Sequence, residues 1–345
     1  MANKTKKAEI LLNYAPCIEL PPISPAGLHA RACQNDAVTI SSWRETWISN
    51  SKANFARFGG FHEKGIGKLF GQFSHLPVIV AGSGPSLKTN GHLLKDRKTE
   101  MKLVSCLHNF HFFEDLDVEV DFYVTLDSGK IVIDEVSEGG AHDEDWYWER
   151  SKDKKLLAFI GTDPKLFEKW QGEIYFFNCP ISEPELERLN KEEWHFNTYV
   201  GTGGNVLGAC TYIAKAIFGG NPIVFIGADF SFANYNVEKP MFHAWESSYD
   251  KTIGNTIPMV DIYGNRVISW PSYANFKSWF DYICMVVPGI WLNCTEGGTL
   301  GAYSEGVLSC VKPMDLEECL RMYSMFEEMR EQCEDPLTET KKLLF

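Results

Sequence analysis

Residues 78–87 read VIVAGSGPSL, in which an apolar run leads directly into a turn rich in glycine and serine. The run is typical of a strand buried on both faces of a parallel sheet. The turn that follows consists of Gly82, Ser83, Gly84, Pro85 and Ser86. Its glycines leave room for a ligand to approach the backbone, and its proline suits the first position of a helix. We therefore expect a helix start whose amides and serine hydroxyls face a phosphate or carboxylate.

The third glycine of the GxGxxG dinucleotide fingerprint is missing, because Leu87 stands at its position. The next apolar run is followed by Cys106-Leu107-His108-Asn109, without the acidic residue that would bind a ribose there. Both features disfavour a dinucleotide-dependent oxidoreductase.

Seven short apolar runs lie between residues 77 and 292, and helix-like stretches separate most of them. The runs are 77–81, 102–106, 122–126, 156–160, 174–177, 223–226 and 290–292. Such runs, alternating with helices, indicate parallel strands covered by helices on both faces. The sequence therefore predicts the α/β fold class, with a Rossmann-like, mainly parallel sheet flanked by helices.

The region before the first run is aromatic and polar, without strand alternation. In the stretch 39–58, Ser41 or Ser42 is expected to cap a helix, with Glu45 completing a capping box, and Gly59-Gly60 to end it. Three parts are expected: a mainly helical accessory region at 1–74, a nucleotide-binding domain at 75–312, and a closing helix with a charged tail at 313–345.

Composition narrows the function classes. The 345 residues are 44% hydrophobic and 23% charged, and no apolar run is long enough for a membrane span. The N-terminus is too polar for a signal peptide, so a cytoplasmic location is expected. A net charge of −13 makes nucleic acid an improbable partner. The ten cysteines show no metal-ligand spacing, which favours reduced structural thiols and predicts no metal site.

A second glycine-rich turn lies at 201–205, before a convincing helix that ends at Gly219-Gly220. Its candidate binding residues are Thr202, Gly203, Gly204 and Asn205. Two helices of one parallel-sheet domain would thus begin at turns without large side chains. Such a pair of helix N-termini suits a ligand with separated anionic or polar groups, such as a nucleotide.

Polar residues follow three of the apolar runs. Asn109 follows the second run, Asp127 ends the third, and Asp229 follows the sixth. Carboxylates at strand ends can bind ribose hydroxyls, a metal or a reacting proton, although aspartates there also make ordinary turns. We take Asp127 and Asp229 as catalytic candidates and Asn109 as a binding candidate.

Taken in order, AGSGPSL, Asn109, DFYVTLD, GTGGNV, FIGADFSF, VDIYGNRVIS and NCTEGGTLGAYSEGV resemble the MptE-like domain over about residues 75–310. That family is named for an archaeal 6-hydroxymethyl-dihydropterin pyrophosphokinase. The same domain forms the core of Maf-type flagellin glycosyltransferases and is similar to bacterial sialyltransferases that use CMP-activated sugars. The resemblance implies that the 82–86 turn, Asn109, Asp127 and the 203–205 turn contact a nucleotide.

The resemblance favours glycosyl transfer from a CMP-type sugar donor to an acceptor that is a glycan, a protein hydroxyl or a small molecule. His243 is then the candidate base for the acceptor hydroxyl. Tyr249 or Tyr263 could steady the departing phosphate, and Glu296 is the expected polar contact of the segment TEGG.

Two alternatives stay open. The pyrophosphokinase branch would need ATP and magnesium, yet its TDLDG and HGDN segments read TLDSG and GTGGN here, so only Asp127 of the acidic pair remains. The other alternative is a nucleotide-binding protein without chemistry that engages a partner through residues 1–74.

Overall fold

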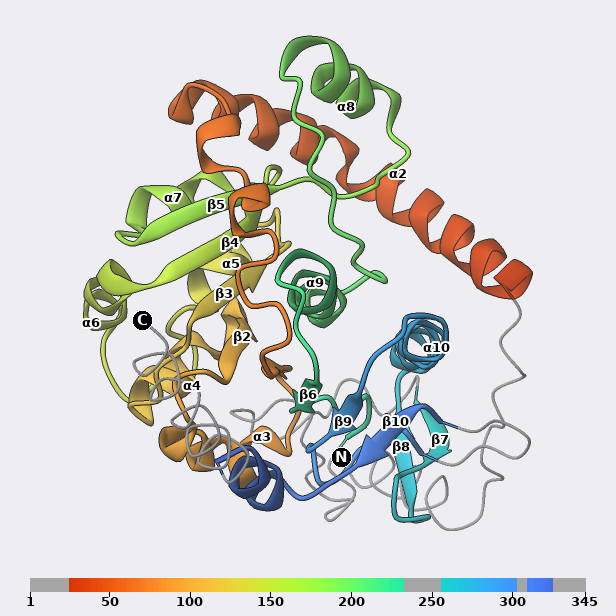
Figure 1. The fold of residues 1–345 in the computed structure, drawn as a ribbon. Helices are drawn as coiled ribbons and strands as arrows, with labels where there is room; N and C mark the ends of the chain where they lie inside the picture. Colours follow the sequence, from red (N-terminus) through yellow and green to blue (C-terminus); the bar gives the residue numbers. More distant parts are fainter. Residues whose placement is uncertain (1–24, 233–255, 303–308, 325–345) are drawn as a thin grey trace, which may run out of the picture.

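A single eight-stranded sheet forms the centre of the computed structural model, which describes residues 25–232, 256–302 and 309–324, with side chains from residue 39 on (Figure 1). Every pair of neighbouring strands in it is parallel. The strands are β1 (Val78–Ala81), β2 (Lys102–Cys106), β3 (Phe122–Thr125), β4 (Lys155–Phe159), β5 (Glu173–Phe177), β6 (Ile223–Ile226), β9 (Trp291–Asn293) and β10 (Val311–Pro313). The α/β prediction is confirmed, and each of the seven apolar runs overlaps a strand to within one residue at either end.

The strand order reverses beside β1. The order across the sheet is β10-β9-β6-β1-β2-β3-β4-β5, so the chain builds outward from β1 in one direction and then returns to add β6 on its other side. Val80 of β1 pairs with Val104 of β2 and with Phe225 of β6. In doubly wound sheets, the crevice at such a reversal, beyond the carboxyl ends of the strands, is where ligands bind.

Helices cover both faces of the sheet. Figure 1 shows α9 and α10 on one face and α3 and α4 on the other. The helices after β1 are α3 (Leu87–Asn90), α4 (Phe110–Asp115), α5 (Ile131–Asp134), α6 (Glu144–Arg150), α7 (Pro164–Lys169), α8 (Pro184–Arg188), α9 (Val206–Tyr212) and α10 (Pro271–Val286), and residues 316–324 are also helical. A π-helical segment, Ile213–Ile217, continues α9 to the glycine pair that was expected to end it.

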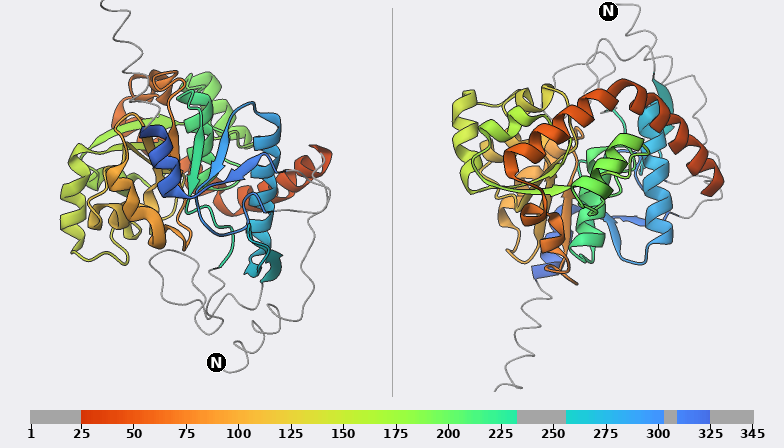
Figure 2. Two further views of the ribbon diagram at one scale, coloured as in Figure 1. Left: turned by 60° about the horizontal axis from the view of Figure 1, so that its bottom comes forward. Right: turned by 90° about the horizontal axis from the view of Figure 1, so that it is seen from above.

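The N-terminal helix α2 (Pro25–Phe58) crosses the carboxyl edge of the sheet, as the right panel of Figure 2 shows. Asn54 Nδ2 donates to the carbonyls of Ile160 and Thr162, just beyond β4, at 2.9 and 2.8 Å. Asn50 Nδ2 donates to the carbonyl of Ser128, beyond β3, at 2.9 Å. Because carbonyls at strand ends have no ladder partner, these two amides join α2 to the sheet.

The expected start of this helix was wrong. Ser41 and Ser42 lie inside α2, which begins at Pro25, so neither caps it. The capping-box pattern is short, and here the helical stretch simply continues through it. The expected end is confirmed, since α2 stops at Phe58 and Gly59 has a φ of 65°.

Replacing Asn54 with alanine should lower the free energy of unfolding by about 1–3 kcal/mol, because the fully buried amide leaves two carbonyls without donors. Lys52→Ala is the matched control on the same helix. Lys52 pairs only with the partly exposed Glu185, so its loss should cost less than about 1 kcal/mol. Urea denaturation measures both, and equal losses would contradict the anchoring role of Asn54.

Three elements were not expected from the sequence. An antiparallel hairpin joins β7 (Ile257–Val260) to β8 (Arg266–Ser269), α10 follows it, and β10 extends the sheet beyond β9. Phe232 donates its amide to the carbonyl of Ile268 at 2.9 Å, so the hairpin lies beside the segment that leaves β6.

Two further observations concern the described residues only. None of their helices combines the length and apolar character required to cross a bilayer. From residue 39 on, where side chains are described, the cysteines are free thiols, of which Cys310 is exposed and the other six are buried.

Candidate functional site

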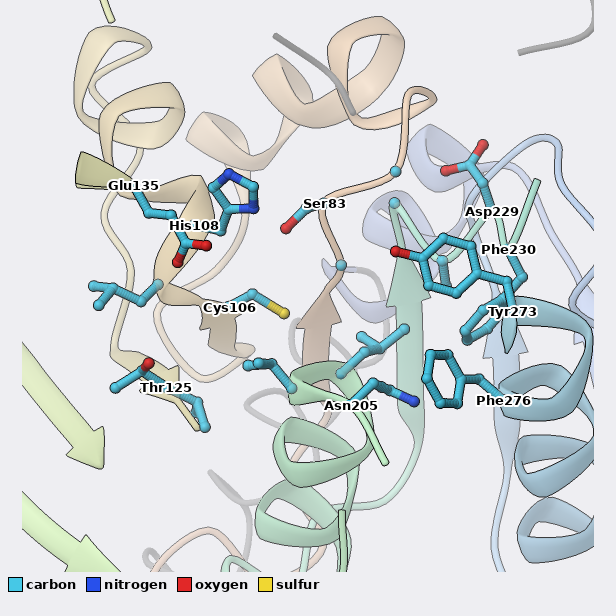
Figure 3. Close-up of a pocket in the computed structure, with 18 of the residues that line it drawn as sticks. Ser83, Cys106, His108, Thr125, Glu135, Asn205, Asp229, Phe230, Tyr273 and Phe276 are labelled. Atoms are coloured by element: carbon cyan, nitrogen blue, oxygen red, sulfur yellow. The ribbon is translucent and has the colours of Figure 1, made fainter. Parts of the chain in front are cut away.

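A cavity of about 270 Å³ lies where the strand order reverses, beyond the carboxyl ends of β1, β2, β3 and β6 (Figure 3). Its polar lining comes from Ser83, His108, Thr125, Asp127, Glu135, Asn205, Asp229 and Ser231. In Figure 3, His108, Thr125 and Glu135 lie on the β2–β3 side, and Phe230, Tyr273 and Phe276 on the side of α10. Ser83 lies between the two groups.

The turn after β1 packs directly against the turn after β6. A Cβ on Gly82 would lie 2.4 Å from the Gly227 carbonyl oxygen, and one on Gly84 would lie 2.7 Å from the same atom. The Gly84 amide donates to that carbonyl at 2.9 Å. Gly82 and Gly84 line the cavity, as expected of ligand-binding residues, but this close backbone contact is a separate reason for glycine at both positions.

Asp229 occupies the start of α3. The Ser86 hydroxyl donates to Asp229 Oδ2 at 2.7 Å, and the Ser86 amide lies 3.4 Å from the same oxygen. We expected these two donors to face a ligand anion; that expectation is corrected, because a carboxylate of the chain itself takes both. The expectation that Pro85 takes the first helical position was wrong, because Pro85 is buried and lies before Ser86, the N-cap of α3.

The Asp229 carboxyl has a strongly perturbed affinity for protons. Its side chain is 6% exposed, and burial raises its pKa to about 7, although the hydrogen bonds from Ser86 act in the opposite direction. A carboxyl with a pKa near neutrality can accept a proton from a substrate hydroxyl at physiological pH. Among the described residues, Asp229 is therefore a candidate general base in this cavity.

Asp127 and Glu135 bring two more carboxyls to the cavity, from the end of β3 and from the residue after α5. Burial raises the pKa of Asp127, and burial together with the charge of Asp127 raises the pKa of Glu135 to about 8. Two like charges this close cannot both ionise readily. The sequence analysis missed Glu135, which is one of several acidic residues in a short helical stretch and carries no local signal of its own.

An aromatic wall faces these carboxyls. The rings of Phe230 and Tyr273 lie 6.4 Å apart between centroids, and those of Tyr273 and Phe276 lie 5.5 Å apart. The Tyr273 hydroxyl points toward the interior of the cavity in Figure 3. The sequence analysis missed this wall. Aromatic residues recur at every third position from the Trp270-Pro271 pair onward, at 270, 273, 276 and 279, and this spacing could have indicated one face of a helix.

The second glycine-rich turn contributes mainly through Asn205. Asn205 Oδ1 caps α9 by accepting the Gly208 amide at 2.8 Å, and the side chain also lines the cavity. Gly203 and Gly204 have φ values of 57° and 87° and lie against Trp279 and Phe276 of α10. Thr202 Oγ1 accepts the Gly204 amide at 3.2 Å, and these three residues lie outside the cavity lining.

Asn109 and Glu296 make structural contacts and do not line the cavity. Asn109 is fully buried, and its Nδ2 donates to the carbonyl of Gly82 at 3.0 Å, which supports the first turn from beneath. Glu296 Oε1 accepts from Asn90 Nδ2 at 3.1 Å and from the amide of Leu316 at 3.0 Å. Asn109 can therefore influence a ligand only through the turn it supports.

His243 and Tyr249 lie outside the described residues. Tyr263 lies in the turn between β7 and β8, is 63% exposed and does not line the cavity. Among the described residues, Tyr273 is the tyrosine at the place where a departing phosphate was expected to be steadied.

The charge of the cavity is acidic. Asp127, Glu135 and Asp229 line it, and among the residues that the structure describes no lysine or arginine does so. Within the same ranges, no three histidine, cysteine, aspartate or glutamate side chains come together as a metal site. Any magnesium ion would therefore need ligand phosphates to complete its coordination around the two carboxyls on the β3 side.

A doubly wound parallel sheet with a ligand-sized cavity at its strand reversal defines a Rossmann-like binding fold. The family model described as "6-hydroxymethylpterin diphosphokinase MptE-like" matches residues 52–235. The chain therefore belongs to the MptE-like family. The match begins inside α2 and ends before the VDIYGNRVIS and NCTEGG segments.

A similar solved structure is that of a Maf glycosyltransferase from Magnetospirillum magneticum AMB-1, with a TM-score of 0.52 and 15% sequence identity. The similarity covers 70% of this chain but only 34% of that protein, so the chain spans about a third of its length. At this identity the likeness concerns the fold. No curated protein matches the sequence.

Proposed function

We propose that this protein is a nucleotide-dependent transferase that moves a glycosyl group from a CMP-type sugar donor. The observation that carries the proposal is the two-sided cavity at the strand reversal, with three carboxyls of raised pKa and an aromatic wall opposite two of them. Membership of a family named for a nucleotide-using enzyme supports nucleotide binding. The fold shared with a Maf glycosyltransferase supports the choice of glycosyl transfer.

The donor is proposed to lie across the cavity. Its flat cytosine base packs on Tyr273 and Phe276, because aromatic rings favour stacking with other rings. Ser83 and the Tyr273 hydroxyl donate hydrogen bonds to its phosphate. Glu135, with a pKa of about 8, is largely protonated at neutral pH and acts as a further donor rather than as a repelling charge.

In the reaction, the acceptor hydroxyl attacks the anomeric carbon of the donor sugar. The bond from that carbon to the phosphate oxygen breaks, and CMP leaves with the bonding electrons. Asp229 takes the hydroxyl proton as the new glycosidic bond forms. His243, the base expected from the sequence, is the alternative acceptor of that proton.

A second candidate is pyrophosphoryl transfer, as the family description suggests. Its specific support is the Asp127 and Glu135 pair, because magnesium in phosphoryl-transfer sites is usually held by one or two carboxylates together with substrate phosphates. When bound, the metal would neutralise charge on the transferring phosphate.

Thermal unfolding against CMP, CDP, CTP, AMP and ATP, each with and without magnesium, separates the two candidates. A ligand at 100 times its dissociation constant should stabilise the fold by about 2.7 kcal/mol. Stabilisation by CMP or CDP without magnesium is the expected result. A response to ATP alone, and only with magnesium, would instead favour pyrophosphoryl transfer. If CMP binds but neither wild type nor His243→Ala releases CMP from a CMP-sugar, the protein is a binding module.

A further inference from the structure

The helix α2 runs along the carboxyl edge of the sheet, from the end of β4 toward the end of β3, where the cavity carboxyls Asp127 and Glu135 lie. Its contacts move from the carbonyls beyond β4, through Asn54, to those beyond β3, through Asn50, and then to Gly129 through Trp43. Continuing in this direction, the N-terminal end of the helix projects past α10 in Figures 1 and 2. Although no residue of α2 lines the cavity, Trp43 therefore reaches the loop that follows Asp127, which does.

Trp43 forms an apolar platform together with Ile131. A Cβ placed on Gly129 would lie 3.2 Å from Cη2 of Trp43 and 4.0 Å from Cγ2 of Ile131, so the glycine lets the indole lie directly on the backbone of this loop. Trp43 is 39% exposed and Ile131 is 56% exposed. Large apolar side chains that stay exposed together are typical of ligand-contact surfaces.

The platform is continuous with the acidic side of the cavity. Gly129 lies two residues after Asp127, and the Glu135 amide donates to the Ile131 carbonyl one helical turn earlier, at 3.0 Å. A ligand resting on Trp43 would therefore lie beside the segment that carries both carboxyls, with Arg44 already paired to Glu183 and the exposed Lys130 in the same loop. This arrangement suits a molecule with one apolar face and many hydroxyl groups that can bond to both carboxyls and to a lysine.

We infer that Trp43 and Ile131 hold the acceptor of the transfer reaction, and that this acceptor is a sugar in its pyranose form. The inference rests on the proposed function, since it assumes that the donor occupies the aromatic wall of α10. The C–H face of the pyranose ring packs on the indole, and its hydroxyls donate to Asp127 and to the carbonyl oxygen of the protonated Glu135 carboxyl, whose O–H serves the donor phosphate. Donor and acceptor then meet between the two sides of the cavity, within reach of Asp229.

Saturation-transfer NMR with methyl β-D-galactopyranoside tests this inference on the full chain. Wild type should bind the sugar, Trp43→Ala should weaken binding about tenfold or more, and Trp43→Tyr should restore most of it. Phe70→Ala is the matched control, because Phe70 is 72% exposed but precedes β1 at the opposite edge of the sheet. CMP binding, measured on the same samples, should be unchanged in all four proteins and reports on folding.

The outcomes separate the two proposals. If CMP binds but the pyranoside does not, or binds equally to Trp43→Ala, the acceptor inference is wrong and the donor proposal stands. If the pyranoside binds in a Trp43-dependent way while CMP does not bind, the platform stands and the CMP donor is wrong. Binding of a basic peptide at Trp43 in place of the pyranoside would also overturn the inference, in favour of a peptide acceptor.

Discussion

Replacing Asp229 with asparagine is expected to lower the transfer rate by a factor of about 10² to 10⁴, the usual contribution of a general base. Asparagine has nearly the same shape and can still accept the Ser86 hydroxyl, so the loop should keep its structure. The measurement is release of CMP from CMP-N-acetylneuraminate in the presence of an acceptor. Activity of the wild type should rise as the pH increases through about 7, because the base must be ionised.

Asp229→Asn should raise the free energy of unfolding near neutral pH, although it lowers the transfer rate. Burial raises the Asp229 pKa from 3.8 to about 7, so the folded state binds its proton more tightly than the unfolded state does. Wild type therefore loses stability as the pH rises from about 4 to about 7, and the loss is constant above that range. Since asparagine cannot ionise, the variant should be more stable than wild type at pH 8 by about 2–4 kcal/mol, and no more stable at pH 4.

Asp163→Asn provides the control for both measurements. Asp163 is also buried, but it caps α7 through the Lys165 amide and lies outside the cavity lining. Because asparagine caps helices about as well as aspartate, this variant should keep its activity. Full activity in Asp229→Asn would exclude Asp229 as the base and leave His243 in that role.

Gly82→Ala is expected to destabilise the protein by about 3 kcal/mol or more, the upper range for overpacking a close-packed site. The added Cβ would lie 2.4 Å from the Gly227 carbonyl oxygen and 3.1 Å from its carbon. Both are backbone atoms, so no side chain can rotate away, and the two turns at the mouth of the cavity must separate. The affinity for nucleotide should also fall in this variant, because the same two turns line the cavity.

Gly67→Ala is the matched control for the glycine prediction. A Cβ at Gly67 would have only Thr198 Oγ1 within reach, at an ordinary 3.8 Å. Its backbone is compatible with alanine, so this variant should be neutral or more stable by up to about 1 kcal/mol. Equal melting temperatures for Gly82→Ala and Gly67→Ala would mean that the contact between the turns is looser than 2.4 Å implies.

Seven strands of the central sheet were predictable from the sequence, because each consists mostly of buried apolar residues. Runs such as 78–81 and 223–226 are wholly apolar, and that pattern needs no knowledge of neighbours. The hairpin was missed because its two strands have four residues each and are only partly buried. The last strand, β10, has three residues and ends in proline, which carries almost no strand signal.

The site was predictable only in part, for a different reason. The turn after β1 was recognised as a candidate site from its glycines and serines. Asp127 and Asp229 were recognised from their positions at strand ends. What a residue contacts across the chain carries no such local signal. Ser86 and Asp229 are 143 residues apart, and Glu296 contacts Asn90 across 206 residues. The roles of Ser86, Asn109 and the α10 aromatics depend on such long-range contacts, and only the assembled sheet defines them.

The attachment of α2 has a consequence for how the chain folds. Asn54 bonds carbonyls that lie 106 and 108 residues further along the chain, so a growing polypeptide contains this helix long before its docking site exists. Until β4 and β5 are in place, Trp47 and Phe58 lack the rings of Phe159 and Phe176 on which they pack. Such long-range closure is slow and is made late. The apolar face of this helix therefore stays in water while the 106 residues that separate Asn54 from Ile160 are synthesised, and its docking on the sheet is a late step of folding.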